Sequence, residues 1–125
     1  CEEVHFYAVL GGKLDHALAN LQLGIRLAEM GKSAVMHGED CDVFFVANGS
    51  LNVSAAPGTR ASVFSFGESK GVTLRGFDYE LEDAALGFDY ALGVSNEIVS
   101  KIATVTVKDG ALAVFVYEKS GNFRS

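Results

Sequence analysis

The residue types best suited to chemistry gather in residues 11–20, which read GGKLDHALAN. Residues 4–10, just before them, are apolar enough to form a buried strand, and an amphipathic helix pattern follows the two glycines. A helix that begins there directs free N–H groups and the positive end of its dipole at one place, where an anion binds well. The polar side chains around that place are Lys13, Asp15, His16 and Asn20. The pattern is typical of a site for a phosphate-like group.

A plainer interpretation of the same run stays open. Glycines often serve only to shape the turn between a strand and a helix. An acid in the first helical turn, such as Asp15, stabilises the helix dipole without binding anything. His16 and Asn20 are four residues apart, so they can share a solvated helix face.

The elements around this run predict a strand–helix–strand unit. Residues 4–10 and 33–37 are the expected strands. Between them, apolar residues recur at helical spacing, namely Leu14, Leu18, Leu21, Ile25 and Ala28. Gly31 stands where a helix C-terminal cap belongs. Two strands joined by one helix are expected to pair in parallel.

After residues 38–42 no further helical spacing of apolar residues of useful length occurs, which predicts a second, all-β region. Short runs of β-branched and aromatic residues suggest strands at 43–47, 61–66, 71–77, 84–90, 102–108 and 111–118. Tight turns are expected at Asn48–Gly49 and Asp109–Gly110, the second as the turn of a hairpin. Strands of this number and spacing favour a β-sandwich or barrel, followed by a short tail.

Three further stretches allow both a structural and a functional interpretation. Residues 94–97, VSNE, fit a turn best, although they could offer hydrogen bonds to a neutral heterocycle. Residues 67–76, GESKGVTLRG, fit a hairpin better than a phosphate loop. The acidic residues of 78–89 could meet a metal ion, but a solvated acidic face is the expected arrangement.

The amino-acid composition limits the classes of partner that the chain is expected to bind. Ten basic and sixteen acidic residues give a net charge of −6, which works against nucleic acid as a partner. The longest apolar run, residues 111–117, is too short to cross a bilayer, so no membrane partner is expected. Cys1 and Cys41 have neither metal-ligand spacing nor a disulfide pattern, which favours the cytoplasm. Because a strand follows Cys1 so closely, we expect a longer N-terminal portion upstream.

Four segments, in order, resemble motifs of the thiamine pyrophosphokinase family. Residues 11–20 resemble the family's GGRxDHxxAN signature, and residues 71–84, GVTLRGFDYELEDA, resemble its GVTxxGxxYxLxxA stretch. Residues 92–97, LGVSNE, are similar to its GxSNE segment, and residues 105–112, VTVKDGAL, to its closing hairpin. Together these segments cover most of the chain from residue 4 to about residue 117.

The resemblance implies a fold and an activity. It implies that residues 1–40 are the C-terminal part of an α/β, ATP-binding catalytic domain, with its strand–helix–strand unit. Residues 41–120 would form a thiamine-binding β-sandwich of jelly-roll type, so the chain is mostly β, and residues 121–125 would be a tail. Enzymes of this family transfer pyrophosphate from ATP to thiamine with Mg²⁺, giving thiamine diphosphate and AMP, and they act as homodimers.

The resemblance also implies roles for individual residues. Lys13 and Asp15 would be catalytic. The ATP phosphates would be bound by Gly11, Gly12, Lys13, His16 and Asn20. Thiamine would be bound by Asp15, Ser95 and Asn96. The family's usual arginine is Lys13 here, which keeps the charge but lacks the planar fork for bidentate phosphate binding.

The family's Mg²⁺-binding aspartates are expected upstream of Cys1, so no metal ligands are expected within these 125 residues. The chain alone is therefore expected to be inactive. Two alternatives remain: a non-catalytic module for thiamine binding or dimerisation, and a β-sandwich interaction domain whose motifs coincide with the family by chance.

Overall fold

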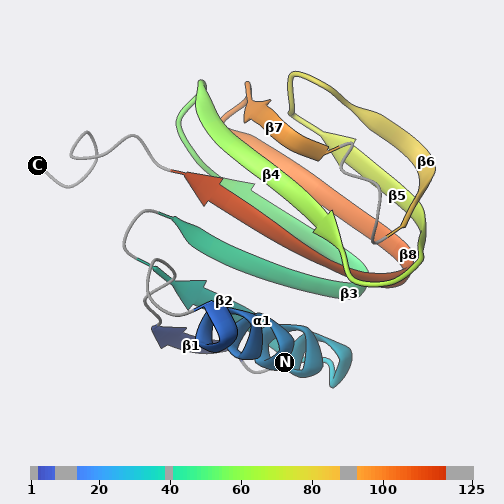
Figure 1. Cartoon of the computed structure of the whole chain (residues 1–125). Helices are drawn as coiled ribbons and strands as arrows, with labels where there is room; N and C mark the ends of the chain where they lie inside the picture. Colours follow the sequence, from blue (N-terminus) through green and yellow to red (C-terminus); the bar gives the residue numbers. More distant parts are fainter. Residues whose placement is uncertain (1–2, 8–13, 39–40, 88–92, 118–125) are drawn as a thin grey trace, which may run out of the picture.

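The structure, a computed structural model, describes residues 3–7, 14–38, 41–87 and 93–117 (Figure 1). Within them, one helix and eight strands follow in the order β1 (Glu3–Tyr7), α1 (Leu14–Glu29), β2 (Ser33–His37), β3 (Asp42–Ser54), β4 (Thr59–Ser65), β5 (Ser69–Arg75), β6 (Leu81–Leu86), β7 (Gly93–Ile98) and β8 (Ile102–Tyr117). The described part of the chain is therefore mostly β-strand.

The strand–helix–strand order predicted for the first part of the chain is present. β1 and β2 pair in parallel, and α1 connects them. The predicted cap is confirmed at Gly31, which adopts a φ of 85°. There the Gly31 N–H donates to the carbonyl of Ala28, and the Lys32 N–H donates to that of Leu27. These two bonds satisfy carbonyls that the end of α1 would otherwise leave open.

The sheet does not stop at β2. β2 pairs with β3 in antiparallel register, from Ala34 opposite Phe45 to His37 opposite Asp42. The strand order then continues through β8 and β4 to β7, while β5 pairs with β8 and β6 pairs with β5. A single hydrogen-bonded path therefore joins the strand–helix–strand unit to the all-β region.

β3 and β8 are long strands that pair along almost their whole length, and this corrects two predictions. No hairpin turn lies at Asp109–Gly110, because β8 continues through it, and no tight turn lies at Asn48–Gly49 within β3. The two sites face each other instead. The ladder is irregular there, and the Gly110 N–H donates to the Asn48 side-chain oxygen at 3.0 Å. Residues with turn propensity here form a bulge.

The bulge separates two halves of the sheet. The Asp42–Ala47 half of β3 pairs with the second half of β8, which also pairs with β4. The Gly49–Ser54 half of β3 pairs with the first half of β8, which also pairs with β5. The two halves pack face to face, as the predicted sandwich requires.

Two other strand predictions need correction. Residues 94–97 were expected to form a turn, but they lie in β7, which pairs with β4. The strand expected at 84–90 begins earlier, at Leu81, and ends at Leu86, while residues 88–90 lie outside the described residues. The first error arises because pairing of β7 with β4 overrides the local turn propensity of residues 94–97.

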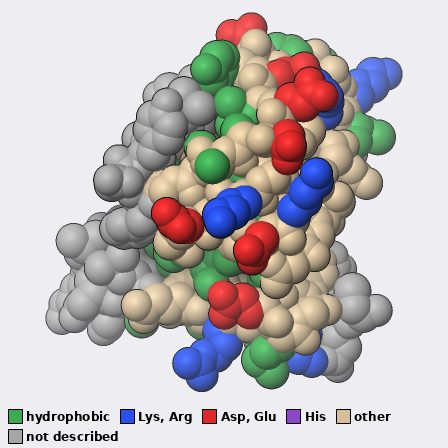
Figure 2. Space-filling model, turned by 90° about the vertical axis from the view of Figure 1, so that its right-hand side faces the viewer, with side chains coloured by type: hydrophobic (Ala, Val, Ile, Leu, Met, Phe, Trp, Pro, Cys, Tyr) green, Lys and Arg blue, Asp and Glu red, His purple; other side chains and the backbone are tan. Residues whose placement is uncertain are grey.

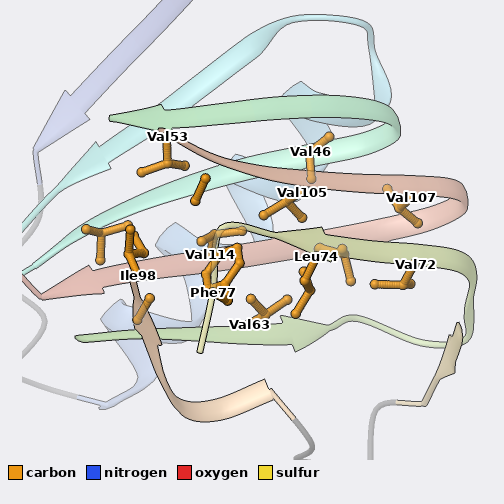
Figure 3. Close-up of a cluster of buried hydrophobic side chains, with 14 of the residues drawn as sticks. Val46, Val53, Val63, Val72, Leu74, Phe77, Ile98, Val105, Val107 and Val114 are labelled. Carbon is orange, nitrogen blue, oxygen red and sulfur yellow. The ribbon is translucent and has the colours of Figure 1, made fainter. Parts of the chain in front are cut away.

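Two clusters of buried side chains occupy the two sides of the sheet half that carries β2. The sandwich core lies between the sheet halves (Figure 3) and includes Val46, Val53, Val63, Val72, Leu74, Phe77, Ile98, Val105, Val107, Leu112 and Val114. The helix-covered core lies under α1 and includes Ile25, Ala28, Ala34, Met36, Cys41, Val43, Phe45, Ala111 and Ala113. Residues 111–114 alternate between the two cores, which explains the continuous apolar run there.

Close packing of α1 on the sheet depends on a glycine. A Cβ at Gly24 would lie 2.3 Å from the ring of Phe45 in β3. Figure 1 shows α1 lying across β2 and β3 on the side away from β5 and β6. No helix in the described part of the chain is long and apolar enough to cross a membrane.

Candidate functional site

The predicted phosphate site at the start of α1 falls largely outside the described residues. Gly11, Gly12 and Lys13 lie outside them. Asp15 and His16 lie in the first turn of α1, and their side chains are likewise outside what the structure describes. Asn20 lies one turn further along and is half-buried. The anion-binding role of these residues therefore stays a prediction.

Two of the three predicted thiamine residues, Ser95 and Asn96, lie next to each other in β7 at the end of the sheet, whereas Asp15 lies in α1. The side chain of Ser95 is outside the described residues. Asn96 is 6% exposed, and its amide is engaged by backbone groups. Its Oδ1 accepts from the N–H of Tyr79 at 3.0 Å and from that of Glu97 at 2.8 Å. Its Nδ2 donates to the carbonyl of Tyr79 at 2.8 Å.

These bonds hold the segment between β5 and β6, residues 76–80, which we call the Tyr79 segment. Phe77 anchors it, because its side chain is 2% exposed in the sandwich core and its backbone bridges to Ile98. The Asp78 N–H donates to the Glu97 carbonyl at 2.7 Å. The segment therefore runs beside β7 and is attached to it at successive residues.

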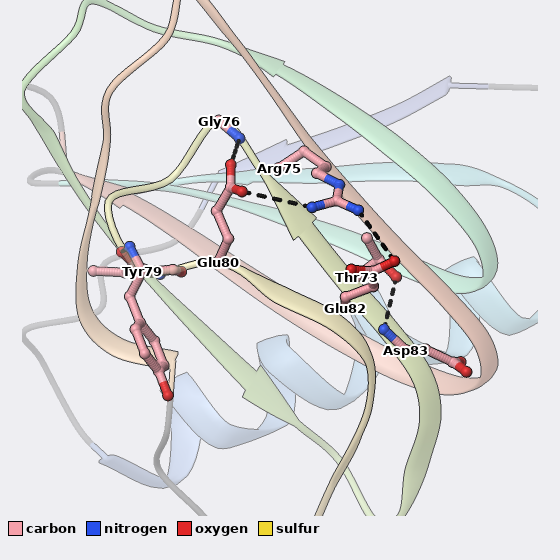
Figure 4. Close-up of polar contacts among 8 residues, drawn as sticks. Thr73, Arg75, Gly76, Tyr79, Glu80, Glu82 and Asp83 are labelled. Carbon is pink, nitrogen blue, oxygen red and sulfur yellow. Dashed lines mark hydrogen bonds and ion pairs between the residues drawn. The ribbon is translucent and has the colours of Figure 1, made fainter.

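A second set of contacts fixes the other end of the Tyr79 segment (Figure 4). One oxygen of Glu80 accepts from the Gly76 N–H at 2.8 Å, and the other lies 3.6 Å from Arg75. Arg75 also lies 3.6 Å from Glu82. Each of these side chains is at least 44% exposed, so the ion pairs contribute little to stability. Their effect is to hold local geometry.

The acidic stretch behaves as a solvated face. Glu80 and Glu82 share Arg75, and Asp83 lies 3.4 Å from Lys108. Acidic and basic side chains lie interspersed on the face shown in Figure 2. Among the described residues, no group of three or more His, Cys, Asp or Glu side chains could hold a metal ion.

Sequence analysis matched Tyr79 to the tyrosine of the family's GVTxxGxxYxLxxA stretch but gave it no role. Its side chain is 51% exposed although its backbone is bonded on both sides by Asn96. Figure 4 shows its ring pointing away from the ion pairs of Arg75. The motif marks the position of Tyr79, but only the Asn96 contacts show that its backbone is held in place.

A chain of side-chain hydrogen bonds across β1, β2 and β3 was also not foreseen. His5 Nδ1 lies 2.8 Å from His37 Nε2, and His37 Nδ1 lies 3.1 Å from Asp42 Oδ1. The two rings are nearly parallel, with an interplanar angle of 8°. One imidazole nitrogen donates to the other, so these bonds link the edge strand β1 to the rest of the sheet.

A shallow cleft of about 160 Å³ lies between the end of α1 and the bulge in β3, where Lys32, Phe45 and Ser50 are among its lining residues. None of the predicted site residues lines it. Asn96 therefore contacts Tyr79, and neither residue lines this cleft.

Comparison with known proteins supports the resemblance seen in the motifs. Residues 51–112 match the family model described as "Thiamin pyrophosphokinase, vitamin B1 binding domain". This range runs from the second half of β3 into the second half of β8, so it includes the Tyr79 segment and Asn96. No curated protein sequence matches the chain.

Solved structures share the fold. Thiamine pyrophosphokinase from Bacillus subtilis is similar with a TM-score of 0.84 at 20% identity, covering 95% of this chain and 57% of that one. The enzyme from Geobacillus thermodenitrificans gives 0.81 at 20% identity, covering 97% and 56%. Thiamin pyrophosphokinase from Candida albicans gives 0.74 at 12% identity, covering 93% and 44%.

The chain therefore spans less than two thirds of the length of each of these relatives. At these identities the likeness concerns the fold, whereas the family model concerns the sequence of the sandwich. The likeness to the solved structures spans nearly the whole chain, whereas the family model matches residues 51–112. This chain belongs to the thiamin pyrophosphokinase family, whose vitamin B1-binding domain is matched by its residues 51–112.

Proposed function

We propose that this chain is the thiamine-binding part of a thiamine pyrophosphokinase. In the proposed reaction, the hydroxyl oxygen of thiamine attacks the β-phosphorus of ATP, the bond from that phosphorus to the α-phosphate oxygen breaks, and AMP leaves. The hydroxyl proton is released, and thiamine diphosphate forms. The observation that carries the proposal is the match of residues 51–112 to the vitamin B1-binding domain.

The electrostatics of the chain support this substrate. Thiamine carries a positively charged thiazolium ring, and the chain has a net charge of −6. Such a balance raises the local concentration of a cation. Ser95 and Asn96 lie within the matched range, where we propose that they serve thiamine binding.

For ATP, the proposal relies on the start of α1. Gly11, Gly12 and Lys13, with His16 and Asn20, would bind the phosphates, and Lys13 with Asp15 would act in the transfer. Phosphoryl transfer depends mainly on positioning and on neutralising charge, which a lysine and the N-terminus of a helix can supply. As the family resemblance implies, we place the Mg²⁺ ligands in another part of the enzyme and route no step through the ion.

The domain division belongs to the same proposal. Residues 1–40 would be part of the ATP-binding domain, residues 41–120 the thiamine-binding domain and residues 121–125 a tail. The intact enzyme would be a homodimer in the cytoplasm.

Calorimetry with thiamine and the purified chain tests the binding function. We expect saturable heat with the wild type and roughly tenfold weaker binding for Ser95→Ala, because a hydrogen bond to the ligand is lost. Ser54→Ala is the matched control, since Ser54 is an exposed serine at the far end of β3. A folded wild-type sample that gives no heat with thiamine would contradict the proposal.

Measuring AMP release tests the catalytic part. We expect none from the 125-residue chain with ATP, Mg²⁺ and thiamine, and turnover from a longer protein that contains it. If the longer protein binds thiamine but releases no AMP, the alternative of a non-catalytic thiamine-binding module is the correct one.

A further inference from the structure

We infer that His5, His37 and Asp42 form an acid-sensitive link, which we call the histidine latch, that holds β1 on the sheet. Among the described residues, β1 pairs with β2 and with no other strand. Side chains extend this attachment to a third strand, because His5 on β1 bonds His37 on β2, and His37 bonds Asp42 on β3. In the sequence, β1 comes shortly before residues 11–16, which we propose bind ATP. The latch therefore fixes the strand that precedes this segment.

The two imidazoles have the geometry of a hydrogen bond in the plane of the rings. His5 Nδ1 lies 2.8 Å from His37 Nε2, and the interplanar angle is 8°. The ring centroids are 5.0 Å apart, which is close to the largest separation that two imidazoles joined by such a contact can have. The rings therefore meet edge to edge, so that the lone pair of one nitrogen points at the N–H of the other.

Asp42 decides which of the ring nitrogens carry hydrogen. A carboxylate can only accept, so His37 Nδ1 is the donor in the 3.1 Å bond to Asp42 Oδ1. In a neutral imidazole the other nitrogen then has a lone pair, so His37 Nε2 accepts from the Nδ1–H of His5. Both bonds thus have one donor and one acceptor, and all the donors point toward Asp42.

Protons that bind one after the other affect the histidine latch differently. A first proton on His5 Nε2 leaves the bond from His5 Nδ1–H to His37 in place, and Asp42 compensates its charge. The remaining lone pair is that of His37 Nε2, so a second proton puts hydrogen on both facing nitrogens. Two N–H groups cannot bond each other, and two cations repel, so the bond breaks. Imidazoles titrate between about pH 5 and 8, so we expect the latch to open at the acid end of this range.

The groups that face the two histidines come from three strands, because α1 packs on the opposite face of β2 and β3. Alternation along the strands places the following described side chains on the same face as the pair: Ser33, Val35, Asp42 and Phe44. Of these, Asp42 carries the charge. The side chains of Glu3 and Tyr7 in β1 lie outside the described residues. Asp42 is therefore the group through which we expect a charged latch to be stabilised.

NMR of the ¹⁵N-labelled chain tests the bond itself. At about pH 7.5 we expect a scalar coupling between His5 Nδ1 and His37 Nε2, since a hydrogen bond transmits it, and a hydrogen on His37 Nδ1. The coupling should vanish by about pH 5, where both facing nitrogens carry hydrogen. A hydrogen on His37 Nε2 at the higher pH, or a coupling that persists at the lower pH, would overturn the inference.

Hydrogen exchange of the β1 amides tests whether this bond holds the strand, after correction for the intrinsic effect of pH on exchange. From about pH 7.5 to about pH 5, protection of the β1 amides should fall about tenfold, as expected for the loss of one hydrogen bond, whereas β5 and β8 should keep theirs. In His5→Leu the β1 amides should be less protected at both pH values, without the further fall.

Ser50→Ala is the matched control, because Ser50 and Thr106 form a cross-strand bond of 2.9 Å between two side chains that do not titrate in this range. This variant should keep the wild-type response of β1 to pH. An equal loss of protection in β1, β5 and β8, or a fall in β1 that His5→Leu retains, would overturn the latch.

Asp42→Asn separates the charge from the hydrogen bond. The asparagine oxygen can still accept from His37 Nδ1, so protection of the β1 amides at about pH 7.5 should stay within about twofold of the wild type. Without the carboxylate the added charge is not compensated, so the latch should open at a higher pH than in the wild type. Opening at the same pH would overturn the role of Asp42. These measurements use the chain without thiamine or ATP, so their outcome is independent of the proposed function.

Discussion

The sandwich core and the helix-covered core share one sheet but differ in what surrounds them. The sandwich core is enclosed by strands on both sides and consists mostly of valine and leucine. The helix-covered core lies between that sheet and α1, and its rim includes the half-buried aromatic residues Phe66, Phe115 and Tyr117. One strand, β8, supplies alternate residues to both cores.

This difference assigns each core to a different part of the proposed site. The sandwich core anchors the Tyr79 segment through Phe77. The helix-covered core holds α1, whose first turn carries Asp15 and His16. A change in one core should therefore disturb one part of the site before the other, although both cores contribute to the stability of the whole.

The largest effect is expected from Phe77→Ala in the sandwich core. Phe77 is among the largest fully buried side chains, so we expect a loss of about 3–5 kcal/mol in the free energy of unfolding, measured in urea. Hydrogen exchange should accelerate first in the Tyr79 segment. Met36→Ala is the matched change in the helix-covered core, and its exchange should accelerate first in α1. Identical exchange patterns for the two variants would remove the distinction between the cores.

The next largest loss of stability is expected from a substitution in the bulge between the two sheet halves. Gly110 has a φ of 138°, and a Cβ there would lie 2.4 Å from Ser69 Oγ and 2.7 Å from Ser69 Cα. We expect Gly110→Ala to cost about 1–3 kcal/mol in urea unfolding, through strain and crowding. At Gly49, on the partner strand, a Cβ would meet only the Ala47 carbonyl oxygen at 3.6 Å. Gly49→Ala is thus the control, and an equal cost for both would contradict the argument.

A smaller net effect is expected where α1 packs on the sheet. The Cβ of Gly24→Ala would crowd the Phe45 ring, at a cost of about 1–3 kcal/mol, while alanine favours the helix by about 1 kcal/mol. We expect a net loss of about 1 kcal/mol in the free energy of unfolding. In a Phe45→Leu background the crowding should ease, so Gly24→Ala should become neutral or stabilising. A loss of the same size in both backgrounds would exclude the Phe45 contact as the cause.

The smallest effect concerns pH and the rim of the helix-covered core. Burial, followed by the nearby Cys41, raises the pKa of Tyr117 above its usual value of 10.0, against a lowering by Arg60. The folded state thus holds this proton more tightly than the unfolded state, so stability falls as pH rises through about 10 and beyond. Thermal unfolding should show a steeper loss above pH 10 for the wild type than for Tyr117→Phe. Parallel curves would show that Tyr117 makes no such contribution.

Local patterns in the sequence determined the helix, its C-terminal end and the family of this protein. The helix from Leu14 to Glu29 follows from apolar spacing, and its end follows from Gly31. The ordered motifs identified the family, which the match of residues 51–112 confirmed. These predictions were correct because each depends on residues that lie close together in the sequence.

Only the tertiary structure decided which of the segments with turn propensity form turns, bulges or strands. Asn48 and Gly110 lie 62 positions apart and meet across β3 and β8, so two apparent turns became one bulge. Asn96 and Tyr79 lie 17 positions apart, and the Asn96 amide bonds to the backbone N–H and carbonyl of Tyr79, a contact that no local pattern predicts. The physical reason is that glycine and asparagine favour turns and bulges equally, and a partner strand distant in the sequence selects between them.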